Sequence, residues 1–204
     1  MARYLESVCK RCFRCSDKLM LKGSRCLSPK CAIDRRRRNT GRRRRISDRG
    51  LQLIEKQKAR FTYGMMEQQF RRFFGQAQRQ PGITGENLMV LLERRLDSIV
   101  YRLGLADSRS QARQLVQHGH IVLNGQKTDI PSCLVKEGDT ISWRESTTKT
   151  EYYKQLVESI KGKSVAGWLS LDREKIVGKV LYLPTPDEIG AKFNSKTIVE
   201  YYSR

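Results

Sequence analysis

The sequence contains no run of apolar residues long enough to cross a membrane. Its most basic stretch, residues 35–45, also lacks the interleaved Trp, Phe and Leu residues that anchor a segment in a lipid surface. The first six residues do not lead into the apolar core of a secretory signal, and Glu6 argues against a transit peptide. We therefore expect no membrane partner, and we expect the chain to stay in the compartment where it is made.

Negative charge is scarce as well. The chain has 41 Lys and Arg residues against 21 Asp and Glu residues, so its formal net charge is +20. Residues 1–60 hold twenty of the basic residues and five of the acidic ones, a net charge of +15, and residues 61–204 supply only +5. Such an excess needs a polyanionic partner, for which nucleic acid is the first candidate.

Residues suited to catalysis are few. The only histidines are His118 and His120, and no carboxylate lies close to them in sequence, so a turn-forming, RNA-facing role is favoured over acid–base chemistry. After residue 145 about sixty residues remain, with no His, no Cys and no glycine-rich phosphate loop. This is short for a catalytic domain. We expect neither an enzyme nor a small-molecule substrate.

The cysteines are concentrated near the beginning of the chain. Five of the six lie between positions 9 and 31; they are Cys9, Cys12, Cys15, Cys26 and Cys31. Two close pairs separated by a loop suit a tetrahedral zinc ion, with disulfides or a four-cysteine iron–sulfur cluster as alternatives. Because Cys12-x2-Cys15 is as well spaced as Cys9-x2-Cys12, five thiols compete for four positions. We expect a structural metal that staples residues 1–31, which hold too few apolar side chains to fold alone.

Eight arginines follow within residues 35–45. Their mutual repulsion and the absence of apolar side chains exclude a packed element formed by this run alone. The run could be a solvated tail, a localisation signal or a phosphate-binding arm that becomes ordered on RNA. We favour the arm, because the run lies between the cysteine cluster and a predicted helix, and because the planar guanidinium can bind a phosphate through two hydrogen bonds. RNA affinity should then fall steeply with added salt.

Hydrophobic periodicity predicts helices and a few strands in the rest of the chain. Ser47 and Ser108 are the expected N-caps of two of the helices. Asn124-Gly125 suits a tight turn between two strands, because both residues tolerate positive φ. The predicted helices span 47–64, 66–77, 84–103 (with or without a bend), 108–117, 151–161 and 195–202, and the predicted strands span 120–123, 126–130, 140–143 and 179–183.

These elements predict an α+β fold. We expect a mostly helical domain with an inserted small helix-plus-β-hairpin RNA-binding module and a cysteine-bound metal knob at the N-terminus. The predicted parts are a knob and arginine-rich arm at 1–46, a helical domain at 47–94 plus 164–204, and the small module at 95–163. The apolar stretch near residues 88–103 is the predicted core, and Trp143 and Trp168 are expected to be structural.

Residues 95–104 (RLDSIVYRLG) and 108–125 (SRSQARQLVQHGHIVLNG) resemble the family of bacterial small-subunit ribosomal protein four. The module at about 95–145 also occurs in tyrosyl-tRNA synthetases and pseudouridine synthases, so alone it indicates only structured RNA. The flanking matches favour the ribosomal family, and they extend the resemblance over nearly the whole chain. They lie at residues 47–48, 55–58, 69–71, 84–85, 168–172 and 200–204.

The resemblance implies a structural constituent of the small ribosomal subunit that binds its ribosomal RNA directly and early in assembly, at a junction of several helices. It implies a place beside the path by which messenger RNA enters, and a contact with small-subunit protein five that affects decoding accuracy. The expected location is the bacterial cytoplasmic ribosome rather than an organellar one. Relatives with a cysteine-bearing N-terminus use the positions of Cys9, Cys12, Cys26 and Cys31, which leaves Cys15 as the spare thiol.

The resemblance also assigns Arg109, Arg113, Gln117 and His118 to a surface for RNA phosphates and sugars, of which Arg109 and Arg113 are the strongest candidates. The basic arm and the exposed flanks of the predicted helices extend this surface. The predicted RNA-binding residues are Arg3, Arg35, Arg36, Arg37, Arg38, Arg42, Arg43, Arg44, Arg45, Arg49, Lys56, Lys58, Arg60, Arg71, Arg72, Arg109, Arg113, Gln117, His118, His120 and Asn124.

Two other classes of protein fit the sequence less well. An RNA-modifying enzyme that used the small module to hold its substrate would need a catalytic domain, for which the chain has little room. A metal-stapled DNA-binding regulator would be expected to show the C-x2-C to H-x3-H pattern or paired recognition helices, and neither is evident.

Overall fold

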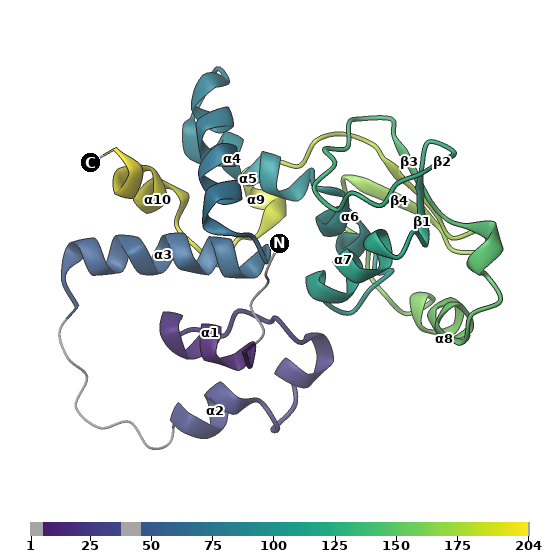
Figure 1. The fold of residues 1–204 in the computed structure, drawn as a ribbon, viewed down its shortest axis with the longest axis horizontal. Coiled ribbons are helices and arrows are strands. Elements are labelled where there is room, and N and C mark those ends of the chain that lie inside the picture. The colour runs from purple at the N-terminus through teal and green to yellow at the C-terminus, as the bar shows by residue number, and fades with distance from the viewer. Residues whose placement is uncertain (1–5, 38–45, 204) are drawn as a thin grey trace. The chain divides into compact units, whose positions relative to one another are not determined.

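The computed structural model describes residues 6–37 and 46–203, which divide into two units (Figure 1). The helical unit comprises residues 6–37, 46–85 and 191–203, and the sheet unit comprises residues 86–190. Most of the predicted arginine-rich arm, residues 38–45, lies outside the described residues, as does Arg3. Among the described residues, no helix has the length and apolar character required to span a membrane.

The helical unit contains the cysteine-rich segment (residues 6–37), the two long helices that follow it and the last helix of the chain. Ser47 caps α3 by accepting a hydrogen bond from the backbone N–H of Gly50, as predicted, and Gly64 turns the chain after this helix with a φ of +60°. The elements of this unit are α1 (Cys9–Cys15), a short 3-10 helix (Gly23–Cys26), α2 (Ala32–Arg37), α3 (Asp48–Thr62), α4 (Glu67–Arg79) and α10 (Ser195–Tyr202).

Helix α10 returns to this unit from the far end of the chain and packs on α3. The ring of Tyr202 stacks on Phe74 at 4.4 Å between centroids and on Phe70 at 6.5 Å. Gly85 permits a close approach to Ser195, because a Cβ atom at position 85 would lie 2.9 Å from the Ser195 hydroxyl oxygen. The aromatic residues predicted to form one side of α4 therefore do form its buried face.

The sheet unit is built around a five-stranded antiparallel sheet with strand order β2-β1-β3-β5-β4. Asn124 and Gly125 have φ values of +50° and +80° and form the predicted tight turn. The strands are β1 (Ile121–Leu123), β2 (Gln126–Lys127), β3 (Thr140–Trp143), β4 (Leu169–Asp172) and β5 (Val177–Val180), and the helices are α5 (Thr84–Glu93), α6 (Leu96–Arg102), α7 (Arg109–Gln117), α8 (Glu151–Ile160) and α9 (Pro186–Ile189).

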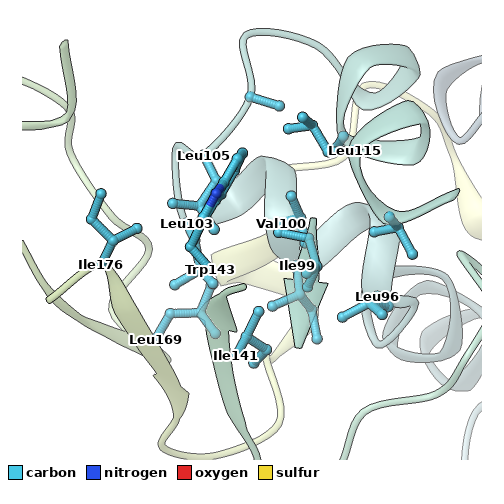
Figure 2. Packing of buried hydrophobic residues seen from close by; sticks show 14 of the residues in the cluster. Leu96, Ile99, Val100, Leu103, Leu105, Leu115, Ile141, Trp143, Leu169 and Ile176 are labelled. Carbon is cyan, nitrogen blue, oxygen red and sulfur yellow. The ribbon is translucent and has the colours of Figure 1, made fainter. Parts of the chain in front are cut away.

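The core of the sheet unit lies between α6 and the sheet (Figure 2). Ile99 of α6 and Leu103, which directly follows this helix, belong to the same buried cluster as Ile141 on β3. Gly178 on β5 lets the helix approach the strand closely, because a Cβ there would lie only 2.5 Å from a methyl carbon of Leu103. Trp168 joins this core with 1% of its surface exposed. The predicted core stretch and the structural role of the tryptophan are thus confirmed.

The structure agrees with the predicted elements only in part. The helix expected over 84–103, with or without a bend, is interrupted at Arg95, so the bent alternative is the one found; Arg95 takes an extended conformation and forms an isolated bridge with Leu134. Strand β4 was not predicted, and the strand expected at 179–183 lies instead at Val177–Val180. Because β5 pairs with β3, strands β4 and β5 belong to the sheet of the small module, although the predicted division placed 164–204 in the helical domain.

Candidate nucleic-acid interface

The carboxylate of Glu93, the last residue of α5, binds two arginines of the sheet unit. Arg102 donates to it twice, from Nε at 3.1 Å and from Nη2 at 2.7 Å. Arg109 donates from Nη2 at 3.0 Å to an oxygen that also accepts from Arg102. The Glu93 side chain is fully buried, whereas both arginine side chains are partly exposed. One negative charge therefore faces two positive charges, which leaves this part of the surface positive.

Asp97, in the first turn of α6, repeats this arrangement. Arg95 donates to both of its oxygens, at 3.0 and 2.6 Å, and Arg113 approaches one of them at 3.5 Å. Arg95 and Asp97 are both buried, and the Arg113 side chain is 21% exposed. The location of Asp97 at the start of a helix is favourable for its negative charge. Again one carboxylate holds two guanidinium groups, of which one reaches the surface.

Helix α7 carries one of the two arginines that each of these carboxylates holds. It begins at Ser108, whose hydroxyl accepts a hydrogen bond from the backbone N–H of Gln111, as predicted. Arg109, Arg113 and Gln117 follow one another at four-residue spacing and so lie along one side of the helix. The guanidinium of Arg109 also lies over the ring of Tyr101, 4.6 Å from its centroid. The structure thus brings together the α7 residues that the sequence singled out.

The residues after α7 combine an exposed and a half-buried imidazole. His118 is exposed, and His120 stacks on Trp143 with 5.6 Å between ring centroids. Burial lowers the pKa of His120, and the neighbouring His118 and Arg144 lower it further. His120 therefore favours its neutral form and extends the aromatic packing around Trp143. Of the two predicted histidines, His118 is the one that the structure leaves on the surface.

Asn124 is engaged within its own turn. Its side-chain oxygen accepts a hydrogen bond from the backbone N–H of Thr140 at 2.8 Å, and its amide nitrogen donates to Asp139 at 2.8 Å. These bonds hold the hairpin to β3, so the polar groups of this side chain are used internally in the described structure. The neighbouring Lys127, which was not predicted, is exposed on β2 and presents a positive charge there.

Lys56 does not lie on an exposed flank of α3, contrary to the prediction. Only 4% of its surface is exposed, and its ammonium group forms an ion pair with Glu67 at 2.7 Å. It also lies 4.8 Å from the centroid of the Tyr201 ring. The reason is tertiary packing. Residues of α4 and α10 cover a side of α3 that is polar in sequence and would be exposed in an isolated helix.

Lys58 is likewise engaged in ion pairs. It contacts Glu55 at 2.7 Å and Asp17 at 3.2 Å, which ties α3 to the cysteine-rich segment. Burial works to lower the pKa of Lys58, but its hydrogen bonds to Glu55 and Asp17 outweigh this and raise it. Arg60, in turn, contacts Gln57 and lies over the ring of Phe61. The predicted basic flank of α3 is thus used mainly to hold the helical unit together.

Other predicted residues are exposed as expected. Arg35 lies in α2, Arg49 lies in the first turn of α3, and Arg71 and Arg72 lie on the outer side of α4. Six of the predicted arginines, Arg3, Arg38, Arg42, Arg43, Arg44 and Arg45, lie outside the described residues, and Arg36 and Arg37 are placed only as part of the backbone of α2.

Four of the clustered cysteines lie near one another. Burial raises the pKa of the Cys12 thiol, and Cys26, Cys9 and Cys31 are close enough to raise it further. The backbone N–H of Leu19 is directed at Cys12, and that of Lys22 donates to the Cys26 sulfur at 3.3 Å. Backbone N–H groups aimed at sulfur stabilise thiolates, including those bound to a metal.

Cys15 has different surroundings. It is buried beside α3 in the cluster that also contains Phe61, and its electrostatic neighbours include Lys58 and Glu55. Burial raises the pKa of its thiol to about 11, even though Lys58 acts in the opposite direction. Cys15 thus packs as a small apolar side chain against α3.

The thiols around Cys12 fit a soft divalent cation in their chemistry and number. Their side chains do not form a preassembled ligand set, since among the described residues no three His, Cys, Asp or Glu side chains are placed so that they could hold a metal ion. The six cysteines of the chain are free thiols, so no disulfide is formed in place of such a site.

The described structure is a mixed α+β fold in which basic side chains reach the surface on α7, on the outer side of α4 and in the first turn of α3. Arginines held by buried carboxylates on a rigid helix are suited to binding phosphates, because their forked donors are already oriented. These features define a class of proteins that bind a nucleic-acid backbone.

Comparison with known proteins identifies the family. The sequence profile of the ribosomal protein S4/S9 N-terminal domain matches residues 3–93, and that of the S4 domain matches residues 94–141. The chain is 55% identical to small ribosomal subunit protein uS4 of Dehalococcoides mccartyi and 51% identical to that of Pelotomaculum thermopropionicum, with 100% of each chain covered. The chain belongs to the uS4 family of small ribosomal subunit proteins, which confirms the resemblance seen in the sequence.

Proposed function

We propose that this protein is a structural constituent of the small ribosomal subunit, where it binds ribosomal RNA and carries out no catalysis. The observation that carries the proposal is the full-length match to relatives named small ribosomal subunit protein uS4, at 55% and 51% identity. Since these relatives come from bacteria, the proposed location is the cytoplasmic ribosome of a bacterium. The two buried carboxylates nearest the arginine surface, Glu93 and Asp97, are paired with guanidinium groups, which suits binding better than acid–base chemistry.

The proposed RNA-binding surface has two parts. In the sheet unit it consists of Arg109, Arg113, Gln117 and His118, in and directly after α7. In the helical unit it is formed by exposed arginines, which are Arg35, Arg49, Arg71 and Arg72. The arginine-rich run at 35–45 extends the second part as a phosphate-binding arm. Lys56, Lys58, Arg60 and Asn124 are left out of this surface, because their polar groups have partners in the protein.

The family resemblance supports a more detailed role. We propose that the protein binds early in assembly of the subunit body, that it lies beside the path by which messenger RNA enters, and that it contacts small-subunit protein five. Through that contact it would influence translational accuracy. The messenger RNA and protein five are therefore proposed neighbours.

We further propose that Cys9, Cys12, Cys26 and Cys31 hold a structural zinc ion, with an iron–sulfur cluster as the alternative. Four thiolates would leave no coordination position for water, so the metal would stabilise the cysteine-rich segment without hydrolytic chemistry. Elemental analysis of the purified protein should find about one equivalent of zinc. Absence of both zinc and iron would overturn the proposal.

Binding measurements test the RNA-binding function. At one salt concentration, the full-length protein should bind folded small-subunit ribosomal RNA more tightly than transfer RNA or duplex DNA of similar length. The RNA affinity should then fall steeply as salt is raised, because phosphate contacts release counterions. Tighter binding to duplex DNA, or an RNA affinity that hardly changes with salt, would contradict the proposed function.

A further inference from the structure

The two buried carboxylates of the sheet unit have a feature in common that RNA binding alone does not explain. Glu93 and Asp97 each bind one arginine of α7, Arg109 and Arg113 respectively, together with a second arginine from outside α7. For Glu93 the second arginine is Arg102, which also donates to the carbonyl of Ile189 at 2.7 Å. Arg109 and Arg113, which reach the surface, are therefore each bound by a buried carboxylate.

Holding an arginine before it meets RNA has an energetic consequence. A free arginine side chain loses about 2 kcal/mol of rotamer entropy when it is fixed by a ligand. A guanidinium that is already fixed by a buried carboxylate has lost much of this freedom during folding, so binding RNA requires less further ordering. The side chains of Arg109 and Arg113 are 17% and 21% exposed, so each of them still reaches solvent while it is held by its carboxylate.

We infer that Glu93 and Asp97 are positioning residues for RNA binding, because each fixes one arginine of α7 in the orientation in which it receives a phosphate. The inference rests on the proposed RNA-binding function and names two acidic residues as necessary for it. Neither residue touches the RNA. Each acts through its own arginine, Glu93 through Arg109 and Asp97 through Arg113.

The sign of the mutational effect separates this role from a simple charge effect. If the carboxylates only reduced the positive charge of the surface, Glu93→Gln would make the surface more positive and RNA binding tighter. If they position the arginines, the same substitution releases Arg109 and weakens binding. Gln and Asn are suitable replacements because they keep nearly the same shape and one acceptor oxygen while removing the charge.

The experiment measures binding of the full-length protein to a folded small-subunit ribosomal RNA transcript. Glu93→Gln and Asp97→Asn are each expected to weaken binding about tenfold. In an Arg109→Ala background, Glu93→Gln should have little further effect, whereas in an Arg113→Ala background it should keep its full effect. Asp97→Asn should have little further effect in the Arg113→Ala background and its full effect in the Arg109→Ala background. Each double-mutant cycle is therefore the control for the other.

A control for stability accompanies the cycles. Leu156→Ala removes a buried side chain of α8 and should lower the melting temperature without changing RNA affinity at temperatures where the variant is folded. Should Glu93→Gln fail to fold, the Asp97→Asn cycle tests the inference by itself, and the milder Glu93→Asp and Asp97→Glu variants, which keep the charge but shift its position, provide a second series.

Three outcomes can be distinguished. Weaker binding that depends on the partner arginine supports the inference. Unchanged or tighter binding by the carboxamide variants, or an equal loss in both arginine backgrounds, overturns it while leaving the proposed function intact. If the wild-type protein shows no preference for ribosomal RNA, the proposed function fails, and the inference fails with it.

Discussion

The cysteine-rich segment (residues 6–37) and the sheet unit bury very different side chains. In the sheet unit, leucines, isoleucines, valines and two tryptophans form one continuous cluster between α6 and the sheet. In the cysteine-rich segment, four of the buried side chains are cysteines, accompanied by Leu19 and Ile33. Thiols contribute little apolar area, so the segment needs another source of stability, whereas the sheet unit has a core of ordinary composition.

The two regions also fix their basic residues differently. In the sheet unit, buried carboxylates hold arginines whose outer parts are partly exposed. In the helical unit, Lys58 joins α3 to Asp17 of the cysteine-rich segment, so this cation is part of the internal packing. Basic side chains therefore serve two purposes in this protein. The partly exposed arginines of α7 are available to bind RNA, whereas Lys58 stabilises the packing of the helical unit.

The largest expected effect concerns the dependence of the cysteine-rich segment on metal. Cys12→Ser should abolish metal binding, because it removes the thiol at the centre of the group, and with it binding free energy on the order of 10 kcal/mol. Hydrogen exchange should then show loss of protection throughout residues 6–37 and none in the sheet unit. Metal content and exchange are measured on the same samples.

Two cysteines serve as controls for this variant. Cys15→Ala should keep the metal, because Cys15 packs against α3, and Cys133→Ser alters a half-buried thiol of the sheet unit. Full metal content in Cys12→Ser, or loss of the metal in Cys15→Ala, would contradict the assignment of the ligands.

The reverse perturbation removes apolar packing from the sheet unit. Leu103→Ala deletes a fully buried side chain in contact with β5 and should lower the free energy of unfolding of this unit by about 3–4 kcal/mol. Denaturant titration monitored by Trp143 and Trp168 fluorescence measures it, since both tryptophans belong to this core. The exposed Leu181→Ala is the matched control, with an expected change within about 0.5 kcal/mol. Loss of metal from Leu103→Ala protein would argue against independent stabilisation of the two regions.

Features set by neighbouring residues could be predicted from the sequence. The caps at Ser47 and Ser108, the Asn124-Gly125 turn and the apolar face of α4 depend on local spacing, and the structure confirms them. The family could also be predicted, because the motifs that carry the resemblance are short stretches of sequence.

Features set by distant partners could not be predicted in this way. Whether and where the helix over 84–103 bends depends on the pairing of Arg95 with Leu134, and the burial of Lys56 depends on Glu67 and on α10. Glu93 and Asp97 did leave a signal, because two acids within the most apolar stretch of the chain must have buried partners. Periodicity alone does not say which arginines those partners are.

A smaller effect should distinguish a cation that stabilises the fold from one that binds RNA. Lys56→Met should lower the stability of the helical unit by about 1–2 kcal/mol, a modest value because Glu67 remains partly exposed and keeps its bond to Tyr202. RNA affinity should be unchanged where the variant is folded. Arg71→Ala should leave stability within about 0.5 kcal/mol and reduce the salt dependence of RNA binding by about one phosphate contact. Reduced RNA affinity of folded Lys56→Met protein would show that Lys56 contributes to RNA binding after all.

The smallest expected effect is a pH dependence of the link between α3 and the cysteine-rich segment. Burial works to raise the pKa of Asp17, but hydrogen bonds from Lys58 and from the backbone of Lys18 outweigh it and hold the pKa below its ordinary value. A carboxylate with a lowered pKa in the folded state contributes stability that is present above its unfolded pKa of about 3.9 and is lost as pH falls through the folded pKa.

Wild-type protein should therefore lose more stability between about pH 5 and pH 3 than the Asp17→Asn variant does, by less than about 1 kcal/mol because the pair is partly exposed. Thermal unfolding over this range measures the difference. Asp172→Asn in the sheet unit is the matched control, since it changes a carboxylate that lies outside this link. Parallel pH profiles for wild-type and Asp17→Asn protein would mean that the contact between Lys58 and Asp17 does not contribute to the attachment of the cysteine-rich segment. The packing of Cys15 beside Phe61 would then have to hold the two together.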